Sequence, residues 1–68
     1  MEKGWEFIFA SNDLIRIDIV KSKLEENDIK SVSVDKRSSS MISVGEIEVY
    51  VRVEDAILAK IILQQIAF

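Results

Sequence analysis

The chain of 68 residues contains no cysteine and no histidine. Without cysteine it forms no disulfide bonds, and without either residue the usual ligands of zinc and iron–sulfur sites are missing. The same absence removes the thiol nucleophile and the imidazole acid/base group on which many enzymes depend. We therefore expect a protein that is not an enzyme and that has no metal and no cofactor.

Aromatic residues are also scarce, at 7% of the chain, whereas 49% of its residues are hydrophobic. A domain of this length buries only about 60% of its unfolded surface, and without disulfides or metals it depends on tight packing or on association. A small core has little room for such an aliphatic excess. We therefore expect a homo-oligomer, either a dimer or larger, or another protein as partner.

Basic clusters and long apolar runs are missing too. The formal charge is −3, from 12 acidic and 9 basic residues spread along the chain, so nucleic acid is not an expected partner. Residues 57–63 form the longest aliphatic cluster, but it contains Lys60 and is far shorter than the roughly 20 residues that span a membrane. Residues 7–10 are too few for the apolar part of a signal peptide. We expect no membrane partner and a cytoplasmic location.

Three runs of the sequence are typical of β-strands. The clearest, residues 46–53, alternates over its whole length. We expect its inner face to carry Ile47, Val49, Val51 and Val53, and its outer face Glu46, Glu48, Tyr50 and Arg52. In residues 5–10 the alternation predicts an aromatic side toward the core, formed by Trp5, Phe7 and Phe9. In residues 31–35 it predicts Val32 and Val34 inside, with Ser31, Ser33 and Asp35 facing water.

Two segments are typical of helices. Ser11, Asn12 and Asp13 offer capping oxygens before a helix over 14–27, whose core face we expect to carry Ile17, Val20 and Leu24, with Leu14 close by. Asn27 is expected to end this helix in the left-handed conformation. A second helix begins at the acidic pair 54–55 and runs to about residue 66, and its core stripe should consist of Ala56, Ala59, Ile62, Leu63 and Ile66.

The second helix is apolar on nearly all sides. Ile57, Leu58 and Ile61 lie opposite its core stripe, and a 68-residue monomer has nothing left to cover them. We interpret these three residues as a subunit or partner interface. Ile15 and Ile19 point away from the core of the first helix and are either ordinary exposed residues or an extension of that surface, together with Phe68.

The segment 36–45 has no period and is long for a connection between strands. Its basic pair and serines suggest an anion or partner loop, formed by Lys36, Arg37, Ser38, Ser39 and Ser40. The alternative is an ordinary solvated loop, because the glycine-rich pattern of phosphate-binding loops is absent. Glu46 and Glu48, which share a strand face, are interpreted as solvated residues because an open face offers no burial to separate their pKa values.

The predicted order of elements is βαββα. A right-handed crossover through the first helix leaves room for the third strand between the other two. The expected architecture is a single α+β domain over residues 1–68: a three-stranded antiparallel sheet of order 1-3-2 with two helices on one face. This is the ferredoxin-like pattern without its last strand. The run 5–10, including Trp5, would then be an uncovered edge to which another chain could add a strand.

Several short motifs resemble a known bacterial family. They are Ser11-Asn12-Asp13, Ile17, Val20-Lys21-Ser22, Leu24-Glu25, Ile29, Glu48-Val49-Tyr50-Val51, Glu54-Asp55-Ala56 and Ala59. With these, nearly the whole chain resembles the small domain described as a putative prokaryotic signal-transducing protein. The resemblance implies a PII-like ferredoxin fold and a regulatory or ligand-sensing role, with partner contacts in the loop 36–45. It does not extend to ATP binding, because no nucleotide motif of the PII proteins is present.

The chain departs from the pattern of that family at three places. Asp28 stands where a glycine is usual after the first helix, Ile17 where a small residue is usual, and Ile57 and Leu58 where the second helix is polar. The last departure favours an interface on that helix. Our leading hypothesis is a non-catalytic regulatory or protein-interaction module, signal transducing and self-associating. The alternative is a sensor domain that binds a small anion or metabolite through the 36–45 loop.

Overall fold

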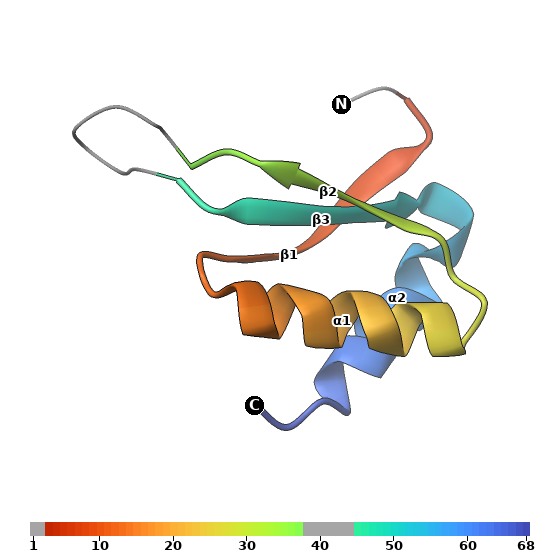
Figure 1. Cartoon of the computed structure of the whole chain (residues 1–68). Helices are drawn as coiled ribbons and strands as arrows, with labels where there is room; N and C mark the ends of the chain where they lie inside the picture. Colours follow the sequence, from red (N-terminus) through yellow and green to blue (C-terminus); the bar gives the residue numbers. More distant parts are fainter. Residues whose placement is uncertain (1–2, 38–44) are drawn as a thin grey trace.

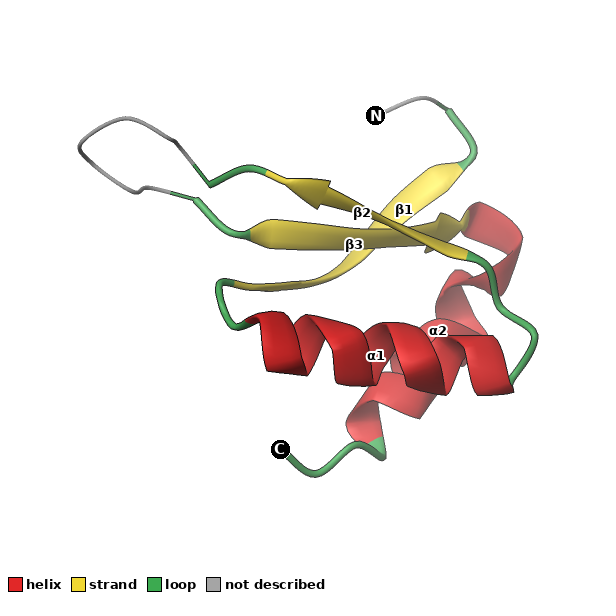
Figure 2. Cartoon of the chain, viewed as in Figure 1, coloured by secondary structure: helices red, strands yellow, loops and turns green. Residues whose placement is uncertain are grey.

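The computed structural model describes residues 3–37 and 45–68 and builds them into three strands and two helices around one core. In chain order the elements are β1 (Trp5–Ser11), α1 (Leu14–Glu26), β2 (Ser31–Asp35), β3 (Ile47–Arg52), the 3₁₀ turn η1 (Val53–Asp55) and α2 (Ala56–Gln64). The sheet has the order β1-β3-β2, with both neighbouring pairs antiparallel. Both helices lie on the same side of the sheet (Figures 1 and 2). The predicted ferredoxin-like arrangement is therefore confirmed.

The core lies between β3 and the two helices. Val49 and Val51, in the middle of the central strand, are fully buried, and so are Val20 and Leu24 of α1. On α2 the small side chain of Ala59 is fully buried, which lets this helix lie close to the sheet. The remaining buried hydrophobic residues are Ile17, Ile29, Ile47, Ala56 and Ile62. The core faces predicted for α1 and for residues 47–51 are confirmed, whereas Leu14 is exposed.

Both ends of α1 are held by hydrogen bonds. At its start the Asp13 carboxylate accepts from the backbone N–H of Ile15 at 2.9 Å, as a capping residue should. At its end the N–H groups of Asp28 and Ile29 donate to the carbonyls of Glu25 and Leu24, which is the Schellman pattern. The residue in the left-handed region is Asp28, with φ 59°, and not Asn27 as predicted. The left-handed residue of the turn therefore falls one residue later than predicted.

A β-bulge in β1 changes the predicted orientation of its aromatic residues. Phe7 pairs with Tyr50 of β3, but Phe9 pairs with Val49, so one extra residue lies between them. Phe9 consequently packs against the core. Phe7 is 48% exposed and lies on the side of the sheet away from the helices, which we call the open face. Trp5, opposite Arg52, shares this open face. The prediction that all three aromatic residues face the core is wrong for Trp5 and Phe7, because simple alternation does not continue through a bulge.

The orientation predicted for β2 is also wrong. Ser31 and Ser33 lie opposite the buried residues Val51 and Val49, so the serines are on the helix side of the sheet. A hydrogen bond from the Lys21 ammonium of α1 to the Ser33 hydroxyl, at 3.4 Å, agrees with this side. Val32 and Val34 are therefore on the open face. The alternation correctly grouped the residues of each face, but the register with β3 exchanges the two faces.

The central strand ends earlier than its alternation suggests. Val53 begins η1 and is exposed, so it does not continue the inner face of β3.

The chain enters β3 through Gly45, which has φ +109°, and a Cβ added there would lie 2.5 Å from the carbonyl oxygen of Lys36. The chain entering β3 thus needs glycine both for its backbone conformation and for the close approach to Lys36. α2 is shorter than predicted, and Ile66 follows it as a partly buried residue packed against the core.

Candidate interaction surfaces

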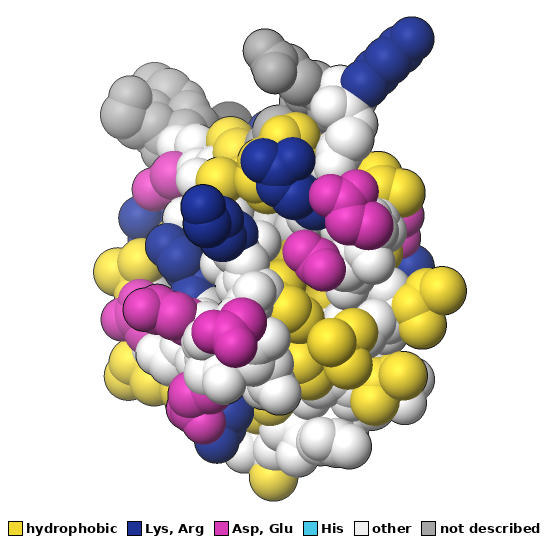
Figure 3. All heavy atoms as spheres, turned by 90° about the vertical axis from the view of Figure 1, so that its right-hand side faces the viewer, with side chains coloured by type: hydrophobic (Ala, Val, Ile, Leu, Met, Phe, Trp, Pro, Cys, Tyr) yellow, Lys and Arg dark blue, Asp and Glu magenta, His cyan; other side chains and the backbone are white. Residues whose placement is uncertain are grey.

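The outward face of α2 carries exposed aliphatic side chains that nothing in the described chain covers. Ile57 is 78% exposed, Leu58 48% and Ile61 46%. Val53 of η1 precedes Ile57 by one helical turn and extends the group, which we call the α2 patch: Val53, Ile57, Leu58 and Ile61. In Figure 3 hydrophobic side chains gather on the side of the molecule where α2 lies. The patch contains the three residues of the second helix that the sequence indicated as an interface. Val53 was missed because it was assigned to the preceding strand.

The other residues proposed for this interface lie elsewhere. Ile15 is exposed and Ile19 is half-buried on α1. Phe68 stacks on Phe9, with ring centroids 5.7 Å apart, and the Arg16 guanidinium lies 5.4 Å from the Phe68 ring centroid. These contacts hold Phe68 against β1 and α1 of its own chain. Phe68 thus contributes to packing the chain end, and only its remaining exposed part is open to a partner.

The free edge of β1 is less regular than the sequence suggested. The bulge between Phe7 and Phe9 interrupts its ladder, and bulges of this kind hinder pairing with a further strand. Trp5 is half-buried, with the Arg52 guanidinium 5.3 Å from its ring centroid. Strand addition at this edge stays a prediction, but the bulge makes it the less favourable of the two edges of the sheet.

At the base of the 36–45 loop, two of the proposed anion-binding residues are already paired within the chain. Arg37 forms a two-pronged ion pair with Asp35, at 3.0 Å from Nε and 2.8 Å from Nη2. The side-chain hydrogen bond to Arg37, together with one from its backbone N–H, lowers the pKa of the exposed Asp35 from 3.8 to about 2. The Lys36 ammonium lies 3.5 Å from a carboxylate oxygen of Glu48. An anion bound here would have to compete with these carboxylates.

Ser38, Ser39 and Ser40 lie outside the described residues, so the anion-sensor hypothesis stays a prediction. Within residues 3–37 and 45–68, no group of three or more acidic side chains converges as metal ligands would. In the same part of the chain, none of the helices has the length and apolarity needed to cross a bilayer.

The open face of the sheet carries a small polar network beside its aromatic residues. The Tyr50 hydroxyl donates to a Glu48 carboxylate oxygen at 2.6 Å, and the Tyr50 ring meets Phe7 edge-on at a centroid distance of 5.9 Å. The hydrogen bond lowers the pKa of Glu48 and raises that of Tyr50. Glu48 is therefore a structural hydrogen-bond acceptor, where the sequence suggested a freely solvated carboxylate. Phe7 completes this face, and its outward orientation could not be predicted from the alternation of residues 5–10.

A family model described as putative prokaryotic signal transducing protein matches residues 5–67. The chain belongs to this family. Its match runs from the first residue of β1 to beyond α2 and thus includes every element of the fold. No curated protein and no solved structure gives a significant match to the chain.

Proposed function

We propose that this chain is a non-catalytic regulatory module that self-associates through the α2 patch. The observation that carries the proposal is the exposure of Ile57, Leu58 and Ile61 side by side on one helix face. A contiguous apolar group of this kind on a soluble domain is typical of a protein-binding surface. The family description, a signal-transducing protein, supports a regulatory role.

A second copy is the partner that the patch fits best. In a two-fold arrangement the same residues meet on both sides, so Ile57 and Ile61 of one helix can pack against those of its mate. Fully burying one such exposed side chain contributes about 1.5–3 kcal/mol to the free energy of association. In a two-fold dimer each residue of the patch is buried once in each copy, so this contribution counts twice. One edge of the patch is polar, because Lys60 forms a 2.7 Å ion pair there with Glu6 of β1. This combination of apolar centre and polar rim is usual in subunit interfaces.

The wider proposal is a cytoplasmic, PII-like regulator that does not bind ATP. A regulatory role fits the family description, and the lack of histidine and cysteine fits a non-catalytic protein. The sequence has no nucleotide-binding motif, so an ATP site forms no part of the proposal. Association with a copy of itself is the step that we propose for transmitting a signal, because association changes which apolar surface is available to other proteins.

The test is the mass in solution of the wild type and of a variant with Ile57→Glu and Ile61→Glu, measured by light scattering between 10 µM and 1 mM. We expect the wild type to associate and this variant to be a folded monomer at 10–50 µM, because two charges desolvated in the interface are costly. Leu14→Glu is the control, since it introduces a glutamate at an exposed apolar residue of α1, outside the patch, and should leave the mass unchanged. A wild type that stays monomeric up to 1 mM would refute the proposal.

A further inference from the structure

The free edge of β2 carries backbone groups that have no hydrogen-bond partner among residues 3–37 and 45–68. The Lys36 N–H donates to the Glu46 carbonyl at 3.1 Å, which fixes the phase of the β2–β3 ladder. In an antiparallel pair such residues alternate, so Val32 and Val34 also direct their backbone groups toward β3. Ser31, Ser33 and Asp35 direct theirs to the outer edge of the sheet. β2 is an edge strand, because the order is β1-β3-β2.

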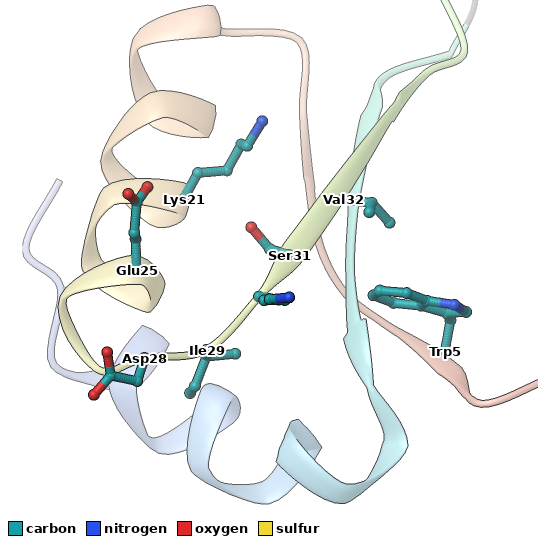
Figure 4. Close-up of a pocket in the computed structure, with 8 residues that line it drawn as sticks. Trp5, Lys21, Glu25, Asp28, Ile29, Ser31 and Val32 are labelled. Carbon is teal, nitrogen blue, oxygen red and sulfur yellow. The ribbon is translucent and has the colours of Figure 1, made fainter.

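An open groove runs beside this edge. Its volume is about 620 Å³, and it is lined on the α1 side by Lys21, Glu25 and Asp28. Figure 4 shows Lys21 and Glu25 on α1 across from Ser31, while Val32 and Trp5, which also line the groove, lie near each other on the other side of β2. The small side chain of Ser31 leaves this space between strand and helix. The groove keeps the edge accessible, so an added strand can approach it without displacing α1.

We propose that β2 pairs with β2 of a second copy, antiparallel about a two-fold axis at Ser33, to make one continuous sheet of both chains. In this register Ser33 faces Ser33 of the other copy, and Ser31 faces Asp35 in both directions. Each of these pairs joins residues whose backbone groups point to the outer edge and have no partner in the described part of the chain, so each pair can exchange two hydrogen bonds. Val32 then lies beside Val34 of the other copy on the open face. The strand is thus complementary to itself in both its backbone and its side chains.

The alternation of β2 is the reason for choosing a second copy as the occupant. An added strand must present polar residues toward the groove and apolar residues toward Val32 and Val34 on the open face. Ser-Val-Ser-Val-Asp has this alternation, and a two-fold axis normal to the sheet keeps both helix layers on the same side. This surface is separate from the α2 patch, so the inference goes beyond the proposed function and stands or fails independently.

Like charges limit the strength of this pairing. The Lys21 ammonium lies 3.4 Å from the Ser33 hydroxyl. Because the two-fold axis passes at Ser33, the Lys21 side chains of the two copies lie close to each other. Lys30 falls opposite Lys36 of the other copy, although Lys36 is partly neutralised by Glu48 at 3.5 Å. Raising the salt concentration screens such repulsion, so we expect the dissociation constant of this contact to fall about threefold between 50 and 500 mM salt. Lys21→Gln should tighten the contact in the same direction at low salt.

A pair of proline variants tests the proposed edge pairing. Ser33→Pro removes an N–H that points to the free edge, so the monomer keeps its ladder while the contact between copies is lost. Val34→Pro is the control, because it removes an N–H directed at β3 and should unfold the chain. By sedimentation we expect the wild type to exceed a dimer at 1 mM. At 1 mM, Ser33→Pro should be a dimer, and so should the variant with Ile57→Glu and Ile61→Glu, which is expected to be a monomer at 10–50 µM. The combination of all three substitutions should be a monomer at both concentrations. A folded Ser33→Pro variant with the wild-type mass would overturn the inference.

Amide exchange measured by NMR gives an answer that does not depend on the folding of a variant with proline. In the Ile57→Glu, Ile61→Glu background, the exchange of the Ser31, Ser33 and Asp35 amides should slow at least tenfold between 20 µM and 1 mM protein. Exchange rates that do not change with concentration would overturn the inference, even if the α2 patch associates. Protection that appears only after another protein is added would also overturn it, because the occupant would then not be a second copy.

Discussion

Phe7 and Tyr50 meet edge-on on the open face of the sheet, with ring centroids 5.9 Å apart and planes inclined by 75°. The bulge that follows Phe7 places Phe9 on the other face, where it packs on the core and stacks against Phe68. Two phenylalanines two residues apart thus have opposite environments. Regular alternation would have given them the same one.

The two phenylalanines should therefore differ in their contribution to stability. Phe7→Ala removes an exposed edge-on pair and should lower the free energy of unfolding by about 1 kcal/mol. Phe9→Ala removes a half-buried ring from the core and should cost about 2–3 kcal/mol, below the range for a fully buried phenylalanine. Urea unfolding at one fixed protein concentration measures both values. Equal losses would contradict the bulge.

The end of α1 offers a stabilising substitution. Asp28 has φ 59° in the Schellman turn, and its charge lies at the negative end of the helix dipole. Asp28→Gly should raise the free energy of unfolding by about 0.5–1 kcal/mol, because glycine adopts this conformation without a Cβ penalty. The melting temperature should rise by about 4 °C.

Asn27→Gly is the matched control for this substitution. Asn27 has φ −105°, outside the left-handed region, and its side-chain amide donates to the Lys23 carbonyl at 2.9 Å. Glycine there gains nothing and loses this hydrogen bond, so the variant should be less stable than the wild type. If instead Asn27→Gly stabilised the chain and Asp28→Gly did not, the turn would begin one residue earlier.

The ion pair of Asp35 and Arg37 predicts a specific pH dependence. The pKa of Asp35 is lowered from 3.8 to about 2 in the folded chain. The ion pair therefore stabilises the folded chain fully at pH values above 3.8, and this stabilisation is lost as the pH falls from 3.8 toward 2. In Arg37→Ala the pKa of Asp35 should return to about 3.8, as followed by carboxyl ¹³C NMR. The stability difference from the wild type should shrink between pH 4 and 2. Lys36→Ala is the control, and a similar rise of the Asp35 pKa in that variant would contradict the assignment.

The sequence was sufficient to predict the order of the elements and the central place of residues 46–53. Periodicity records which side chains share a face, and that was enough to find the core residues Val20, Leu24, Val49 and Val51. The exposed residues Ile57, Leu58 and Ile61 were also predictable, because a helix apolar on all sides exceeds what a small core can cover. These properties depend on local spacing and composition.

The tertiary structure decided which face of each outer strand is covered. The bulge turns Phe7 outward, and the register with β3 places Ser33 rather than Val34 under the helices. Neither is encoded in the alternation of one strand, because both depend on hydrogen bonds to a strand far along the chain. The same long-range ladder leaves the backbone groups of Ser31, Ser33 and Asp35 at the free edge. The sequence alone determined that this chain has apolar surface to spare, and only the packing of its strands decided which faces and edges of the sheet are left open.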